Sequence, residues 1–286
     1  MKKLIVLLLF IPLVSLSQIE GKQHEQLILR GATLVNSTGA PPLGPVDIVI
    51  EKNIITKIQN VGYPGIPISE NRRPKLSKNG VEINCEGSYI LPGFIDTHGH
   101  IGGRSQGASP DYVFKLWIAH GITSIREPGG SLSHELKLEL KNKSEKNKII
   151  APRIYAFSTF NSRVESAEEA REWVRENKKK ESDGIKFFGA APEIMQAAIE
   201  ENKKLGLRST SHHAQLNVVR WNVLNSARAG LNSMEHWYGL PEALFNDRII
   251  QNYPPNYNYQ NEQDRFEEAG KLWKQAAEPF SDHWNS

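Results

Sequence analysis

The sequence predicts an α/β protein: a (β/α)8 TIM-like barrel, of which six strands are recognisable, preceded by a small N-terminal β-sandwich segment. Two observations predict this class. From residue 91 onward, short apolar strands alternate with helical stretches, which implies parallel pairing with right-handed crossovers. Charged or metal-binding side chains stand at the ends of successive strands, and the carboxyl ends of parallel barrel strands open on one face.

Residues 1–17 have the layout of a secretory signal peptide. Lys2 and Lys3 precede an apolar run from residue 4 to residue 14, and small residues follow in front of Gln18. The run is shorter than the roughly 20 residues that a membrane-spanning helix needs, which favours a signal over an anchor. The mature chain is expected to start near Gln18, to be periplasmic or secreted, and to have no stable membrane insertion.

The composition is that of an ordinary globular protein, and its charge does not support nucleic-acid binding. Of 286 residues, 39% are hydrophobic and 23% are charged. Without the two leader lysines, the 35 basic residues become 33 against 32 acidic ones, so the net charge falls from +3 to +1. Cys85 is the only cysteine, so the chain has no internal disulfide. The expected partner is a small-molecule or peptide substrate, with oligomer formation left open.

Residues 18–88 are predicted to form the N-terminal β-segment of a small composite domain. Two apolar runs, 47–50 and 54–58, flank Lys52 and Asn53, a turn that tolerates positive φ, so a β-hairpin is expected there. A Pro-, Gly- and Asn-rich loop at 62–80 separates the hairpin from the next strand.

Residues 89–239 carry the alternating pattern of a partial barrel. Helical stretches between the strands begin at acidic or Ser residues and end at Gly. The strands are "GFIDTHGH", "GITSIREPG", "RIYAFST", "GIKFFG", "LRSTSHH" and "LNSMEHW". The alternative, a doubly wound sheet, would have a Gly-rich phosphate turn after an early strand, and "GGRSQG" lacks that spacing.

His98 and His100 lie on either side of a glycine at the end of the first barrel strand. Residues i and i+2 of a strand share a face, about 6.5 to 7 Å apart, so the two imidazoles can converge on one ion. Gly99 has no side chain to crowd the barrel wall. On its own the pattern is weak, because two satisfied polar histidines explain it equally well.

Two further strands also end in histidine. Period-2 alternation allows only one of His212 and His213 to face inward, and His213 is favoured because it ends its strand; His212 would then have a packing role. His236 ends another apolar strand. Four histidines on successive strand ends are unlikely to occur by chance, which favours a metal site.

Lys186 occupies the middle of a short apolar strand. A buried lysine is costly unless it is paired or functional. One interpretation is a salt bridge with Asp183 or Glu127. The other is that the deprotonated amine reacts with carbon dioxide to form a carbamate, an anion able to bridge two cations about 3.5–4 Å apart.

These side chains together predict a two-metal site. His98 and His100 would bind one ion and His213 and His236 the other, with the carbamate on Lys186 as the bridge. The expected cofactors are therefore two divalent metal ions, with zinc the first choice.

Five ordered motifs resemble the metal-dependent amidohydrolase superfamily, in particular its imidazolonepropionase-like and prolidase-like branch. They are "GFIDTHGH", "GITSIREPGG", "DGIKFF", "HHA" and "AGLNSMEHW", and the similarity runs from about residue 27 to residue 236. The resemblance implies the same five ligands and the hydrolysis of amide or ester bonds. The mononuclear deaminases of the superfamily lack the lysine.

One departure from the family's pattern concerns the general acid/base. Members carry an aspartate after the eighth strand that activates water and protonates the leaving group. Here residues 240–286 read as a lid-like loop and helix, and Asp282 is not assigned that role. The catalytic residue is therefore unknown, and the chain is expected to be a C-terminally truncated fragment.

Three hypotheses follow for the function. The chain is a fragment of an exported binuclear hydrolase of C–N bonds in amides, dipeptides or cyclic amides; or a catalytically inert metal-binding remnant; or a binding module without metal. A mononuclear deaminase-like hydrolase is a further alternative. Arg126 is a candidate clamp for a substrate carboxylate, and Trp237 and Tyr238 are candidates for stacking on a substrate ring. Each could equally be core or rim.

Overall fold

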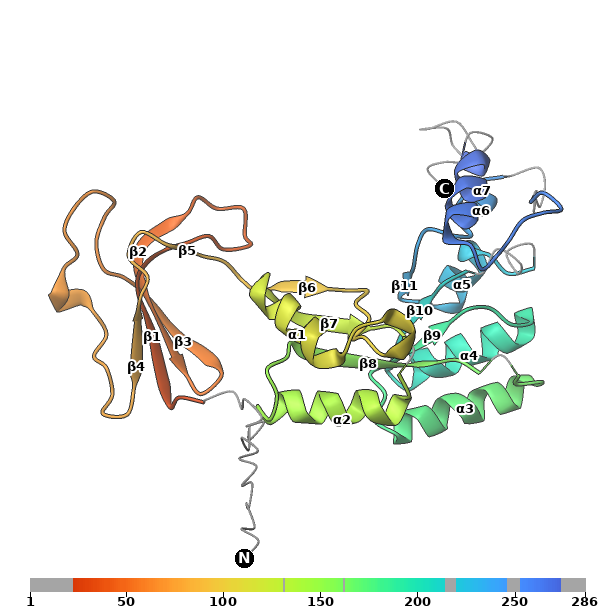
Figure 1. Cartoon of the computed structure of the whole chain (residues 1–286), viewed down its shortest axis with the longest axis horizontal. Helices are drawn as coiled ribbons and strands as arrows, with labels where there is room; N and C mark the ends of the chain where they lie inside the picture. Colours follow the sequence, from red (N-terminus) through yellow and green to blue (C-terminus); the bar gives the residue numbers. More distant parts are fainter. Residues whose placement is uncertain (1–22, 131, 162, 214–219, 246–252, 274–286) are drawn as a thin grey trace, which may run out of the picture.

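The computed structural model describes most of the chain in two parts, an N-terminal β-sheet and an α/β part (Figure 1). The predicted signal peptide at residues 1–17 and the terminal Asp282 lie outside the described residues. None of the described helices is both long and apolar enough to cross a bilayer. The described residues are 23–130, 132–161, 163–213, 220–245 and 253–273.

The N-terminal part is one five-stranded mixed sheet with the order β3-β2-β1-β4, in which β5 also pairs with β1. The predicted hairpin is confirmed: β2 and β3 are antiparallel, and Lys52 has a φ of 57° at the turn. The predicted sandwich is not confirmed, because the described residues of this segment form a single sheet. Its strands are β1 (Gln26–Leu34), β2 (Leu43–Glu51), β3 (Ile54–Asn60), β4 (Val81–Asn84) and β5 (Tyr89–Ile90).

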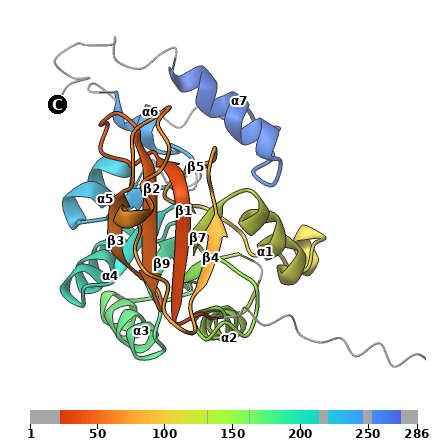
Figure 2. The same cartoon turned by 90° about the vertical axis from the view of Figure 1, so that its left-hand side faces the viewer.

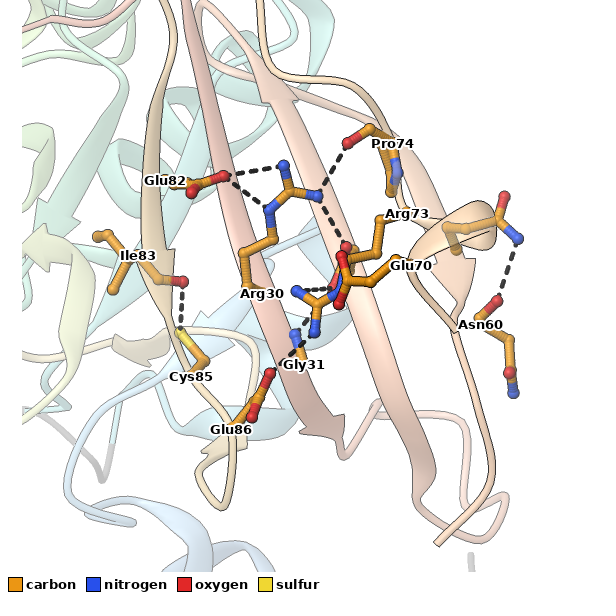
Figure 3. Close-up of polar contacts among 12 residues, drawn as sticks. Arg30, Gly31, Asn60, Glu70, Arg73, Pro74, Glu82, Ile83, Cys85 and Glu86 are labelled. Carbon is orange, nitrogen blue, oxygen red and sulfur yellow. Dashed lines mark hydrogen bonds and ion pairs between the residues drawn. The ribbon is translucent and has the colours of Figure 1, made fainter. Parts of the chain in front are cut away.

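Hydrogen bonds of buried charged side chains connect the long loop between β3 and β4 to this sheet (Figure 3). Asp47 on β2 is fully buried, and it accepts hydrogen bonds from Arg30 Nη1 at 2.9 Å and from the backbone N–H of Gly31 at 2.8 Å. The Arg30 guanidinium also donates to the carbonyl oxygen of Pro74 in the loop, at 2.9 Å. Because a buried carboxylate is tolerated only when it is paired, this cluster stabilises the loop position.

The α/β part contains a six-stranded sheet in which every neighbouring pair is parallel and follows chain order, β11-β10-β9-β8-β7-β6. This confirms the predicted alternation and gives a curled, half-barrel sheet. The strands are β6 (Phe94–Asp96), β7 (Ile122–Glu127), β8 (Arg153–Thr159), β9 (Gly184–Phe187), β10 (Arg208–Ser211) and β11 (Ser233–Met234).

Of the described helices, α1 to α5 lie in an arc around these strands, and α6 and α7 lie at the side that the arc leaves open (Figure 2). Three helices begin at a serine whose side chain accepts a backbone N–H: Ser109 caps α1, Ser133 caps α2 and Ser166 caps α3. These caps agree with the Ser starts predicted for helical stretches. Asn222 caps α5 with a capping box. The helices are α1 (Pro110–Ala119), α2 (His134–Glu145), α3 (Ala167–Lys179), α4 (Pro192–Lys204), α5 (Val223–Ala229), α6 (Leu240–Ala243) and α7 (Glu262–Trp273).

The predicted lid segment contains α6, α7 and the loop before α7. Helix α7 packs against the aromatic residues that follow β11: the ring of Phe266 lies 6.2 Å from Trp237 and 5.8 Å from Tyr238. The described part of the segment therefore lies beside the carboxyl end of the sheet.

Candidate metal centre

His98 and His100 lie just beyond the first barrel strand, because β6 ends at Asp96. The argument from strand alternation therefore does not apply to them. Their rings nevertheless contact each other edge to face, with centroids 5.1 Å apart. A Cβ atom on Gly99 would lie 2.7 Å from the ring of Trp117, so a side chain between the histidines would collide with α1.

His236 joins the first-strand histidines through an unusual backbone conformation. It has a φ of 58°, in the left-handed region, two residues after the end of β11. Its ring lies 4.5 Å from that of His98 and 4.9 Å from that of His212. Such strain in a residue other than glycine is characteristic of functional sites.

His212, and not the favoured His213, contacts this cluster. Thr210 on β10 is in register with Lys186 on β9, so the two side chains share a face, and His212 lies two residues beyond Thr210. His213 takes the opposite face, where its Nε2 is 2.8 Å from the hydroxyl of Ser226. Its buried Nδ1 has no hydrogen-bond partner among the residues that the structure describes.

Lys186 is buried, as predicted, with 2% of its surface exposed. Neither expected salt bridge forms: Asp183 pairs with Lys141 at 2.8 Å, whereas the ammonium of Lys186 lies over the ring of Phe188, 5.2 Å from its centroid. Burial lowers the pKa of Lys186 to about 8, against the opposing effect of the Glu235 charge. A lysine with this pKa is neutral in about a tenth of the molecules at pH 7, a far larger fraction than for an ordinary lysine.

Two glycines after β7 bring this lysine close to the histidines. A Cβ on Gly129 would lie 3.5 Å from the side chain of Lys186, and a Cβ on Gly130 would lie 3.1 Å from Nδ1 of His100. Gly129 has a φ of 100°, which residues with a side chain rarely adopt. The "EPGG" turn therefore packs between two candidate ligands from different strands.

Two buried glutamates were missed by the sequence reasoning as site residues. Glu235 is 5% exposed and Glu127 is 1% exposed. Glu235 contacts Nδ1 of His98, and Glu127 lies 3.2 Å from Nδ1 of His100. The sequence carried a signal for both glutamates, because burying a charged side chain in a short apolar strand costs as much for a glutamate as for Lys186.

The three residues proposed to bind substrate have different surroundings. Each guanidinium nitrogen of Arg126 donates a hydrogen bond within the protein: Nε to the carbonyl oxygen of Thr97, Nη1 to the hydroxyl of Ser233 and Nη2 to the carboxylate of Glu235. Tyr238 is 1% exposed and its ring lies 5.0 Å from that of His212, so it forms a wall of the cluster. Trp237 packs towards α7, with its ring 6.0 Å from that of Trp273.

The donor chemistry of the cluster fits divalent metal ions. Burial lowers the pKa of His212 to about 3 and that of His236 to about 4, so both imidazoles are neutral at pH 7, the form that binds metal. In the described ranges, however, no three His, Cys, Asp or Glu side chains already form a group able to hold an ion. The side chains would have to close further around a metal.

Comparisons of sequence find short stretches of similarity to adenine deaminases. No family model matches the chain. Over 105 residues, 37% of the chain, it is 30% identical to adenine deaminase 2 of Desulfotalea psychrophila. Over 43 residues, 15% of the chain, it is 49% identical to adenine deaminase 1 of Oenococcus oeni. The matches span only 15% and 7% of these two relatives.

Solved structures share the fold over a much larger part of the chain. A Xaa-Pro dipeptidase with bound methionine matches 74% of the chain at a TM-score of 0.53 and 20% identity. An amidohydrolase matches 74% of it at a TM-score of 0.55 and 18% identity. The chain covers 61% and 60% of these two structures. The predicted resemblance to the amidohydrolase superfamily is confirmed at the level of the fold.

Proposed function

We propose that this chain carries the metal centre of a hydrolase that acts on carbon–nitrogen bonds in a small-molecule or peptide substrate. The observation that carries the proposal is the convergence of neutral imidazoles beside a desolvated lysine at the carboxyl ends of a parallel sheet. The names of the similar proteins (dipeptidase, amidohydrolase and adenine deaminase) support the same class of bond.

Four histidines would hold the ions. His98 and His100 keep their first-strand role, His236 keeps its own, and His212 replaces His213 because it faces the cluster. Two divalent ions, with zinc the first choice, would polarise the scissile carbonyl group and stabilise the negative charge that develops on its oxygen. The buried ring of Tyr238 would exclude water from one side.

The bridge between the ions would be a carbamate on Lys186. The lone pair of the neutral Nζ forms a bond to the carbon of carbon dioxide, one C=O electron pair moves onto oxygen, and the nitrogen releases a proton to solvent. The product has one negative charge where the amine had none, which suits a position between two cations. The lowered pKa of Lys186, about 8, supports this step because only the neutral amine reacts.

A mononuclear deaminase-like hydrolase is the second candidate, and the sequence similarity to adenine deaminases favours it. The number of ions distinguishes the two. Elemental analysis after dialysis is expected to give close to two ions per chain for the binuclear site and one for the deaminase-like site. A folded protein with no bound ion would contradict both candidates.

Turnover is tested on the same preparation. Dipeptides, N-acyl amino acids, cyclic amides and adenine are incubated with the zinc-loaded chain, and release of amine or ammonia is measured. The His212→Ala variant should lose turnover, whereas the His120→Ala variant, in which the exposed histidine after α1 is removed, should keep it. Full ion content without turnover on any of these compounds would favour the inert remnant.

Export is proposed from the leader-like pattern at residues 1–17. When the gene is expressed in a bacterial host, the protein is expected in the periplasm or the medium, with a first residue near Gln18. Sequencing of its N-terminus would contradict export if the cytoplasmic protein retained the leader.

A further inference from the structure

Glu235 is a buried carboxylate with partners on three sides. It contacts Nδ1 of His98, accepts a hydrogen bond from the hydroxyl of Thr210, and forms an ion pair with Arg126. Only 5% of its surface is exposed. Each carboxylate oxygen therefore has a protein partner, and the side chain cannot rotate without breaking several contacts.

Glu127 has an equivalent set of contacts around His100. One oxygen accepts a 2.8 Å hydrogen bond from the backbone N–H of Ile101. The other accepts from the backbone N–H of Gly129 at 3.1 Å and from that of Gly130, and it lies 3.2 Å from Nδ1 of His100. Each histidine of the His-x-His pair thus has its own buried glutamate.

The carboxylates determine which imidazole nitrogen carries the proton. An ionised carboxylate only accepts hydrogen bonds, so the nitrogen facing it must be the donor. A neutral imidazole has one N–H group; when Nδ1 carries the proton, Nε2 keeps its lone pair and can bind a metal.

Arg126 acts in this arrangement through Glu235. Its nitrogens donate to the carbonyl oxygen of Thr97, to the hydroxyl of Ser233 at 2.9 Å and to Glu235, and its guanidinium lies 5.5 Å from the ring centroid of Phe157. Each nitrogen of the guanidinium already donates to an acceptor of the protein, which favours a supporting role over bidentate binding of a substrate carboxylate.

We propose that Glu235 and Glu127 are positioning residues that keep Nε2 of His98 and His100 unprotonated for metal binding, and that Arg126 holds Glu235 in place. This inference rests on the proposed metal centre. It reassigns Arg126 from the substrate to the support of a ligand, and it adds two carboxylates to the functional residues.

The Glu235→Gln variant tests the inference directly. Arg126 is a donor, so it should hold the carbonyl oxygen of the new amide and turn the NH2 group towards His98. Nδ1 of His98 must then accept, which moves the imidazole proton to Nε2. In Glu127→Gln the outcome differs, because the oxygen that faces His100 also accepts from the backbone N–H groups of Gly129 and Gly130. It should therefore remain the amide oxygen, and His100 should keep its proton on Nδ1.

The tautomers are read from ¹⁵N–¹H correlation spectra of metal-free full-length chain labelled at histidine, with signals assigned by His98→Gln and His100→Gln. The wild-type protein should show both rings protonated at Nδ1, and Glu235→Gln should switch His98 while Glu127→Gln leaves His100 protonated at Nδ1. The zinc affinity of Glu235→Gln, measured by competition with a chelating dye, should fall about 10- to 100-fold. Glu201→Gln is the matched control. Glu201 on α4 is 6% exposed and pairs with Arg175 on α3 at 2.8 Å, so this substitution should change neither the tautomers nor the zinc affinity.

Wild-type rings protonated at Nε2 would overturn the inference, and so would a Glu235→Gln variant in which the His98 tautomer and the zinc affinity are unchanged. A wild-type chain that binds no zinc would contradict the proposed function instead. The metal-free spectra would still report the tautomers in that case, so the two failures are distinguishable.

Discussion

His212 and His213 are adjacent in the sequence, but they have unrelated partners. The ring of His212 lies 4.9 Å from that of His236, whereas His213 bonds to Ser226, which also accepts a hydrogen bond from Trp221 at 2.7 Å. At the residue scale, therefore, one histidine belongs to the candidate metal centre and its neighbour to the packing of α5.

The two alanine variants should differ accordingly. His212→Ala should lose bound zinc and keep most of its stability. His213→Ala should keep zinc but lose about 1–3 kcal/mol in its free energy of unfolding, because buried polar partners are left unsatisfied. Elemental analysis and urea denaturation measure the two effects. Loss of zinc in His213→Ala alone would restore the original assignment.

Lys186→Ala tests the carbamate. The variant should lose at least one of the two ions, and short carboxylic acids such as formate should restore part of the metal content by occupying the vacant space. Lys141→Ala is the matched control, since Lys141 pairs with Asp183 at 2.8 Å and lies outside the cluster. An alanine variant with both ions bound would make Lys186 structural and favour the deaminase-like interpretation.

At the scale of elements, the turn after β7 determines how close the ligands of neighbouring strands can come. Gly129 has a φ of 100°, and a Cβ there would lie 2.4 Å from Oγ1 of Thr159. Gly129→Ala should destabilise the protein by about 1–3 kcal/mol and weaken zinc binding, because the turn must move away from Thr159 and so shift relative to Lys186 and His100, which it contacts. Gly206→Ala, at a φ of 68° with open space around it, should cost stability without affecting zinc. Equal zinc affinity in the two variants would contradict this role of the turn.

At the scale of the whole molecule, the buried histidines make stability depend on pH. The pKa of His212 is lowered to about 3 and that of His236 to about 4, both chiefly by burial. Between these values and the ordinary value near 6.5, the unfolded chain binds more protons than the folded one, so stability falls as the pH drops through this window. Metal-free protein should unfold at lower urea concentration at pH 5 than at pH 7.5. In His212→Asn, the midpoints of urea unfolding at the two pH values should differ less than in the wild-type protein. An equal difference would contradict the role of His212 as a buried neutral imidazole.

The order of elements could be predicted because it depends on local patterns. Short apolar runs alternate with capped amphipathic stretches, and the structure has six parallel strands in chain order where six were expected. The hairpin at Lys52 followed from two apolar runs that flank a turn tolerant of positive φ. The boundaries were less accurate: the strand expected over "GFIDTHGH" ends at Asp96, before His98. Strand ends depend on pairing with neighbours, which the local pattern does not contain.

By itself, the sequence determined the fold class and the chemical types of the candidate site: imidazoles at strand ends and a lysine inside an apolar strand, each recognisable from its immediate neighbours. Only the tertiary structure decided that His212 faces the cluster, that Arg126 is bonded to Glu235, and that Glu235 faces His98. The last two residues are 137 positions apart in the chain. Their contact depends on the register and curvature of the whole sheet, because these bring the ends of β6 and β11 to the same place.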